Sequence, residues 1–416
     1  MILLLTAVLS GCKMISSHES KESKLRYRNI LLRDFRTVKN GRVINFNIGT
    51  AAHAPATLAV LKKYLPDEVK ITVWADAPLS QELAAMMSRR FPDVPIVYGD
   101  LEKNPSAELL DAVDNADLFL ISSGAGIASS VRRSLDAFKV RTGKPAGAYA
   151  IGCTPGMIPY LDTLDFVWLR DPVAAGIAMK SICPIKGWAP DAVFDFDAAD
   201  TVAAERFMKE NRLKPGEFIC CIPGQRNTPR WQFFGTPANA AKIAENEKFE
   251  EHDNAPLREI ITIAVKEFNL KVLICPEQIT EVDLIRPRIY DQLPPEIQRH
   301  CVPMDKIWSP DTALGVYQAS RGVFGVEIHS QVMALGRGVP GVLLYPPSWG
   351  SKGKMWESIG LAEWFISCDS PDYARRAVAV ARKILSDPEG TAEKLRRVRE
   401  IVDRATRSAV GKSFLK

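Results

Sequence analysis

Residues 322–345, GVFGVEIHSQVMALGRGVPGVLLY, contain the pattern that decides the fold. Two short apolar runs, 322–326 and 341–345, are typical of buried strands, and the segment between them has the composition of a helix that ends near Gly336. A strand, a sharp turn, a helix and a second strand form one unit of a parallel α/β sheet. This order places His329 and Ser330 at the start of the helix, just beyond the carboxyl end of a strand. Backbone N–H groups and the helix dipole favour an anion at such a position.

The same alternation of apolar runs and amphipathic stretches extends along most of the chain. It predicts one set of strands at 42–46, 69–74, 95–98, 118–122, 146–150 and 166–169, and a second set at 218–222, 271–275, 322–326 and 341–345. Between the sets, Leu213-Lys-Pro-Gly216 is a helix stop followed by a turn. We therefore expect an α/β protein with two facing Rossmann-like domains. The expected bounds are a signal and tether at 1–25, an N-terminal domain at 26–205, a C-terminal domain at 206–372 and a basic C-terminal helix at 373–416.

Length, composition and charge agree with this organisation. A chain of 416 residues is longer than one hydrophobic core usually fills. Its 46% hydrophobic and 25% charged residues are typical of a globular protein. The net charge of +5 is small for the length, so we expect no nucleic-acid partner.

The N-terminus resembles a bacterial lipoprotein signal. An apolar run, 1–8, leads into Leu9-Ser-Gly-Cys12, which is similar to a lipobox. This resemblance implies that Cys12 is lipidated and that the protein is anchored to a membrane, facing the periplasm or the cell exterior. A cytoplasmic location stays open, because no basic residue precedes the apolar run and the other seven cysteines suggest no disulfide framework.

The loops that follow predicted strands contain the candidate site residues. His329 is an acid or base candidate near neutral pH, Glu327 is placed to orient or charge it, and Ser330 is placed to cap the helix. His53 is a second acid or base candidate. The alternative for His329 is a capping histidine without catalytic function.

Three cations follow strands of the second domain. Arg226 and Arg230 follow 218–222, and Lys352 follows 341–345, where each could bind an anionic ligand. The alternative is a solvated surface loop. The sequence shows no metal-ligand spacing and no nucleotide-binding fingerprint, so we expect no metal and no cofactor.

Five segments in order resemble the polysaccharide pyruvyl transferase family. They are Asn47-Ile-Gly-Thr50, Asp117-Leu-Phe-Leu-Ile-Ser-Ser-Gly124, Arg170-Asp171, Pro190-Asp-Ala192, and the run from His329 to Pro340. The family's motif usually has an arginine two residues before the histidine, where this sequence has Glu327. The chain therefore looks like a divergent subgroup of the family.

The resemblance implies a GT-B arrangement and a transferase. Such an enzyme would move a pyruvyl group from phosphoenolpyruvate to a sugar of a cell-surface polysaccharide. His329 and Glu327 would be catalytic; the donor and acceptor would be bound by Arg226, Arg230, Lys352, Ser330, Asn47 and His53. Two alternatives stay open: a GT-B glycosyltransferase that uses a nucleotide sugar, and a lipid-anchored polysaccharide-binding protein without catalysis.

Overall fold

The computed structural model describes residues 24–416. The expected lipobox with Cys12 lies outside the described residues. Within residues 24–416, no helix has the length and apolar content needed to span a bilayer.

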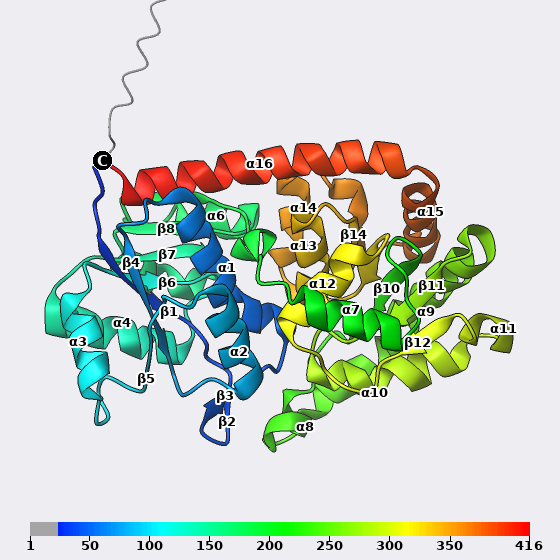
Figure 1. The fold of residues 1–416 in the computed structure, drawn as a ribbon, viewed down its shortest axis with the longest axis horizontal. Helices are drawn as coiled ribbons and strands as arrows, with labels where there is room; N and C mark the ends of the chain where they lie inside the picture. The colour runs from blue at the N-terminus through cyan, green and yellow to red at the C-terminus, as the bar shows by residue number, and fades with distance from the viewer. Residues whose placement is uncertain (1–23) are drawn as a thin grey trace, which may run out of the picture.

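The N-terminal domain is built on a parallel sheet of seven strands (Figure 1). Their order across the sheet is β5-β4-β1-β6-β7-β8-β9. The bounds are β1 (Asn29–Arg33), β4 (Lys70–Ala75), β5 (Ile96–Tyr98), β6 (Leu118–Ile121), β7 (Ala146–Ile151), β8 (Phe166–Leu169) and β9 (Ile185–Trp188). Strands β1, β6 and β8 are nearly or wholly buried along their length, as expected for a parallel sheet covered on both faces.

The C-terminal domain repeats this architecture with a parallel sheet of six strands. Their order is β12-β11-β10-β13-β14-β15, with bounds β10 (Phe218–Ile222), β11 (Lys271–Ile274), β12 (Cys301–Pro303), β13 (Val323–Gly325), β14 (Gly341–Tyr345) and β15 (Phe365–Ser367). The stretch 322–345 therefore forms β13, a helix and β14, as predicted.

Helices cover both faces of the sheets. In the N-terminal half they are α1 (Ile48–Tyr64), α2 (Gln81–Arg90), α3 (Ala107–Asn115), α4 (Ser129–Thr142), α5 (Ile158–Leu161), α6 (Pro172–Ala178) and α7 (Thr201–Glu210). In the C-terminal half they are α8 (Arg230–Phe234), α9 (Ala240–Phe268), α10 (Val282–Leu284), α11 (Pro295–Gln298), α12 (Pro310–Ala319), α13 (His329–Gly336), α14 (Met355–Ser358), α15 (Tyr373–Ser386) and α16 (Pro388–Phe414). One apolar core fills the α3 and α4 face of the first sheet, and a second continues from its other face into the C-terminal domain.

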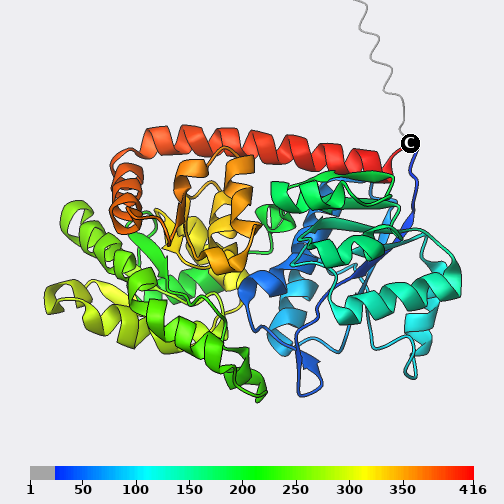
Figure 2. The same cartoon turned by 180° about the vertical axis from the view of Figure 1, so that it is seen from behind.

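The C-terminal region differs from the single helix predicted at 373–416. It contains two helices, α15 and α16, because Asp387 and Pro388 end the first and begin the second. Helix α16 runs across both domains (Figures 1 and 2). Its end returns to the beginning of the described chain, where the Arg26 N–H donates to the Phe414 carbonyl at 2.8 Å. The expected boundary at 205/206 falls inside α7, which packs against α12 of the C-terminal domain.

The prediction of the first strand at 42–46 was wrong. The first strand of the sheet is β1, and Arg42–Val43 forms β3, which pairs with β2 (Val38–Lys39) in a small antiparallel hairpin outside the sheet. Polar Arg42 and Asn45 interrupt the apolar residues of 42–46, whereas the centre of β1 is the uninterrupted apolar run Ile30-Leu-Leu32, the pattern of a central parallel strand.

Candidate active site between the two domains

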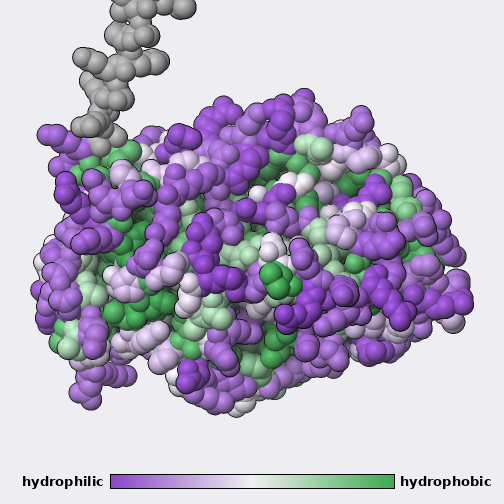
Figure 3. Space-filling view, viewed as in Figure 1, coloured by the Kyte–Doolittle hydropathy of each residue, from purple (hydrophilic) through white to green (hydrophobic). Residues whose placement is uncertain are grey.

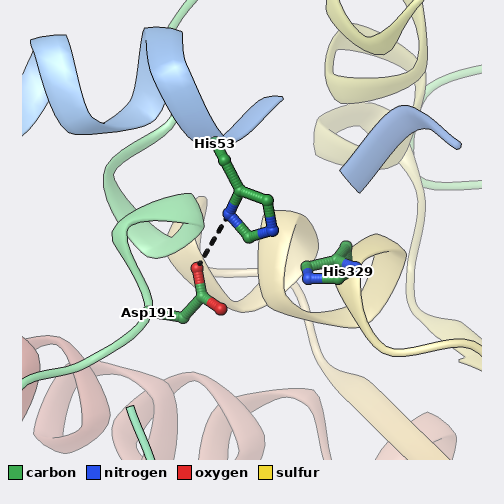
Figure 4. Close-up of side chains that lie close together, drawn as sticks. All are labelled: His53, Asp191 and His329. Carbon is green, nitrogen blue, oxygen red and sulfur yellow. Dashed lines mark ion pairs between the residues drawn. The ribbon is translucent and has the colours of Figure 1, made fainter. Parts of the chain in front are cut away.

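Two histidines, one from each domain, meet beyond the carboxyl ends of the strands (Figure 4). His53 lies on α1, and His329 is the first residue of α13. Their rings are edge to face with centroids 4.9 Å apart. Only 3% of His53 and 9% of His329 is exposed. The predicted position of His329, at a helix start after a strand, is confirmed.

A buried carboxylate, Glu277, holds His329. Its Oε1 lies 3.1 Å from His329 Nδ1, and its Oε2 accepts the Ser330 backbone N–H at 2.7 Å. Burial alone would raise the pKa of Glu277, but its hydrogen bonds and charge pairing with His329 hold that pKa below its usual value. With Nδ1–H donating to Glu277, the ring presents Nε2 to the interface. This atom is buried and has no hydrogen-bond partner among residues 24–416.

Asp191 lies beside His53 and caps the 3-10 helix Ala192–Asp195. Its Oδ1 is 3.7 Å from His53 Nδ1, too long for a hydrogen bond, and its Oδ2 accepts from Arg170 at 2.9 Å. Burial would raise the pKa of Asp191, but the Arg170 guanidinium and the hydrogen bond from the Val193 N–H hold it below its usual value. Burial lowers the pKa of His53 well below its ordinary value, against the opposing effect of Asp191. His53 is therefore a neutral imidazole near pH 7, as a general base requires.

His53, Asp191 and His329 have ligand-type atoms within 4.8 Å of one another, a spacing that could hold a metal ion. The sequence did not show this group, because its members are more than 130 residues apart. Both carboxylate oxygens of Asp191 already accept hydrogen bonds, however: Oδ1 accepts from the Ser123 hydroxyl and the Val193 N–H, and Oδ2 accepts from Arg170. A cation would have to displace these donors next to a guanidinium. The geometry fits a hydrogen-bonded acid–base pair better than a metal site.

Glu327 is not the carboxylate that holds His329, so the prediction that it orients this ring was wrong. Its Oε1 accepts from Gln278 Nε2 at 2.5 Å, and its other neighbours include Glu281 and Lys352. Burial and the charge of Glu277 raise the pKa of Glu327 to about 7. The carboxylate that contacts His329 is Glu277, which comes from the loop after β11.

Arg226 was expected to hold an anionic donor, and the structure contradicts this. Its guanidinium is buried, forms ion pairs with Asp253 and Asp369 at 2.7 Å each, and lies over the Phe249 ring. Two carboxylates neutralise it. Arg226 therefore fixes the loop after β10 to α9 and to the turn that follows β15.

Lys352 and Arg230 remain as cations of the site. Neither makes an ion pair within the described part of the chain. Lys352 Nζ lies 4.3 Å from the centre of the Trp349 ring, and Arg230 lies over Phe46 at 5.0 Å. Glu327 is the main carboxylate that acts on both. Both can therefore approach an anionic ligand.

Ser330 and Asn47, which were predicted to bind substrate, form hydrogen bonds within the protein. Ser330 does not cap α13, because it is fully buried within the first turn of the helix. Its hydroxyl accepts a hydrogen bond from the Tyr317 hydroxyl, and its backbone N–H donates to Glu277. Asn47 caps α1 by accepting the Thr50 N–H at 2.9 Å, and its amide donates to Glu277 at 3.3 Å. Asn47 thus links the N-terminal domain to the carboxylate that holds His329.

Comparisons with known proteins bear on the fold. No family model matches the chain, and no curated protein sequence matches it. Among solved structures, Anabaena HepE in complex with UDP and glucose aligns over 93% of this chain and 99% of its own, with a TM-score of 0.54 and 9% identity. S. aureus MnaA bound to UDP and a glycosyltransferase from Rickettsia africae each align over 92% of this chain and 96% of their own, with TM-scores of 0.53 and 0.52 and 10% identity.

The chain has the GT-B fold. At these identities the likeness establishes the architecture of two Rossmann-like domains, and the predicted fold class is confirmed. In this GT-B chain a cavity of about 1000 Å³ is lined by the amino ends of β1, β4 and β5. The histidines lie at the opposite, carboxyl ends, where ligands of parallel α/β sheets bind.

Sequence reasoning missed Glu277 and Gln278. Both belong to the loop Cys275-Pro-Glu-Gln278 after β11. Ligand-binding residues follow the strands of a parallel sheet, and this loop follows a strand just as the loops after β10 and β14 do. The position of Glu277 and Gln278 after a predicted strand was therefore the sequence signal that could have identified them.

Proposed function

We propose that this chain is a carbohydrate-active transferase whose catalytic groups are His53 and His329. The observation that supports this most strongly is the pairing of two buried histidines from facing domains, each beside a carboxylate. Structural histidines seldom leave buried ring nitrogens without partners. Here His53 Nδ1 and His329 Nε2 both lack one among residues 24–416.

The proposed donor is a nucleoside diphosphate sugar. Two structural neighbours, Anabaena HepE and S. aureus MnaA, are described with UDP, which supports this donor class. In the proposed reaction an acceptor hydroxyl attacks the anomeric carbon while the bond from that carbon to the phosphate oxygen breaks. His53 takes the hydroxyl proton, Nε2 of His329 donates a proton to the leaving phosphate oxygen, and the nucleoside diphosphate leaves with the bonding electrons. Lys352 and Arg230 would stabilise the negative charge on the leaving group.

Pyruvyl transfer is the second candidate, and a specific observation favours it. All five segments that resemble the pyruvyl transferase family meet at the histidines. Asn47 and His329 both contact Glu277, and Ser123 and Arg170 both donate to Asp191. In that reaction two sugar hydroxyls would bond to C2 of phosphoenolpyruvate, C3 would gain a proton and phosphate would leave. Nε2 of a protonated His329 would be the acid.

One assay separates the two donors. The full chain is incubated with a panel of nucleotide sugars, or with phosphoenolpyruvate, in the presence of saccharide acceptors, and released nucleoside diphosphate and phosphate are measured separately. Acceptor-dependent release of nucleoside diphosphate supports glycosyl transfer. Acceptor-dependent release of phosphate from phosphoenolpyruvate supports pyruvyl transfer. Release of neither with any acceptor contradicts a transferase and favours a polysaccharide-binding protein.

Membrane anchoring through Cys12 is a separate proposal that rests on the sequence alone. Changing Cys12 to Ala should move the protein from the membrane fraction to the soluble fraction in its native host. If both forms fractionate alike, the lipobox assignment is wrong.

A further inference from the structure

A second site lies at the far ends of the two helices that carry the histidines. There, a crevice of about 500 Å³ is lined by residues of both domains and of α16. Lys62 and Lys63 contribute from α1, Arg337 follows α13, and Arg399 comes from α16. Lys62 is nine residues after His53, and Arg337 is eight after His329. At 1.5 Å per residue, these separations are about 12 to 14 Å.

Cations outnumber carboxylates in this crevice. Five basic side chains line it, together with Asp195 and Asp197. Arg90 is paired with Asp197 through two hydrogen bonds, at 2.7 and 3.0 Å. Lys63 and Arg399 share Asp195 and the nearby Asp403. No carboxylate lies within 4 Å of Lys62 or Arg337 in the structure of residues 24–416, so neither of these two cations forms an ion pair there.

Arg337 is held in this position by tight packing. A Cβ on Gly336 would lie 2.2 Å from the Phe194 carbonyl oxygen, so only glycine permits the end of α13 to press against that backbone. The next residue, Arg337, is thereby fixed beside Asp195 and Asp197. Its Nε is buried and has no hydrogen-bond partner in the described chain. A buried donor left unpaired is costly, and a ligand that accepts its hydrogen bond removes that cost.

We infer that this crevice is a binding site for a phosphate-bearing anion, separate from the histidine site. Planar guanidinium groups and a lysine ammonium around one cavity match the oxygens and charge of a phosphate group. Because the cations come from both domains and from α16, a bound phosphate would link the two domains at the end of α1 and α13 remote from the chemistry. The inference does not depend on the proposed reaction.

The test is calorimetric titration of the full chain with pyrophosphate at constant ionic strength. We expect saturable binding that Lys62→Gln combined with Arg337→Gln weakens at least tenfold. Lys62 is exposed, so Lys62→Gln alone should leave the fold intact and weaken binding by a smaller factor. Arg133→Gln, which removes an exposed cation on α4 outside the crevice, is the matched control and should bind as the native chain does.

A second variant distinguishes the crevice from the histidine site. Lys352→Gln combined with Arg230→Gln removes the cations of that site and should leave crevice binding unchanged. If this variant loses pyrophosphate binding while the crevice variant retains it, the anion binds at the histidines and the inference is wrong. Absence of saturable binding to the native chain also overturns it.

Discussion

Each of the two interface histidines has a carboxylate beside it, and the two carboxylates act differently. Glu277 contacts His329 Nδ1 at 3.1 Å and also receives the Ser330 N–H, so it fixes both the ring and the start of α13. Asp191 stands 3.7 Å from His53 and is held by Arg170, Ser123 and Val193. Glu277 therefore defines which nitrogen of His329 faces the substrate, while His53 stays a neutral ring that can take a proton.

The change Glu277→Gln tests this orienting contact. A glutamine oxygen can accept from His329 or from Ser330, but its NH₂ group then faces the other donor. We expect turnover to fall on the order of 10²–10⁴. Glu259→Gln, at an exposed position of α9, is the control and should leave turnover unchanged. Equal rates for native and Glu277→Gln protein would show that Glu277 does not orient a catalytic histidine.

The change Glu327→Gln should alter how stability depends on pH. The pKa of Glu327 is raised from 4.5 to about 7 in the folded protein. Its contribution to the free energy of unfolding is therefore complete below pH 4.5, the pKa in the unfolded chain, and is lost as the pH rises through 7. Gln carries no such dependence, and its oxygen can still accept from Gln278. Relative to native protein, the variant should gain on the order of 1–3 kcal/mol in unfolding free energy between pH 5 and pH 8. Urea unfolding at both pH values measures this gain, and parallel pH profiles for the two proteins would contradict it.

Sequence reasoning located the histidines but misassigned the partner of one. The position of His329 followed from local order, since a strand, a turn and a helix are neighbours along the chain. The partner Glu277 is 52 residues away and meets His329 because β11 and β13 flank β10 in the same sheet. Local spacing does not reveal strand order, so the nearest carboxylate in sequence, Glu327, was chosen instead.

At the scale of elements, the site depends on the contact between α1 and α13. Gly49, in the first turn of α1, lies against the His329 ring, and a Cβ added there would be 2.1 Å from His329 Cγ. Glycine at this position therefore allows the N-terminal domain to approach the histidine of the C-terminal domain.

Gly49→Ala should displace His329 and reduce turnover by at least tenfold while lowering the midpoint of thermal unfolding. Gly411→Ala is the matched control, because that glycine also lies in a helix but nothing stands within 4 Å of an added Cβ. Replacing it should leave turnover unchanged and stabilise the protein by about 0.5–1 kcal/mol. Native-like turnover in the Gly49→Ala protein would refute the contact as a requirement of the site.

Most of the strands that sequence reasoning predicted have long apolar runs, although the central strand β1 was missed and the short edge strand β5 was predicted. Most of the central strands of both sheets, such as β6, β7, β10 and β14, were predicted within a residue or two. The edge strands β9, β12 and β15 were missed, and each has three or four mostly half-buried residues. Strands at an edge are short and only partly covered, so their composition is less distinctive than that of a central strand.

At the scale of the whole molecule, the two domains are joined by more than the chain between them. Helix α16 spans both, and an apolar core continues from one domain into the other. The space-filling view shows a largely hydrophilic surface on this face, with apolar side chains in gaps between polar ones (Figure 3). With the histidines almost fully buried, substrate can reach them only when the domains or the surrounding loops move apart.

The most direct test of a two-histidine site compares steady-state turnover of native, His53→Asn and His329→Asn proteins on the donor that the release assay selects. Asparagine keeps a polar side chain but cannot take up a proton. The proposed acid–base pair requires each variant to lose on the order of 10²–10⁴ in kcat while its unfolding midpoint stays within a few degrees of native. Native kcat in either variant would contradict the assignment of that histidine, and native kcat in both would contradict an active site at this interface.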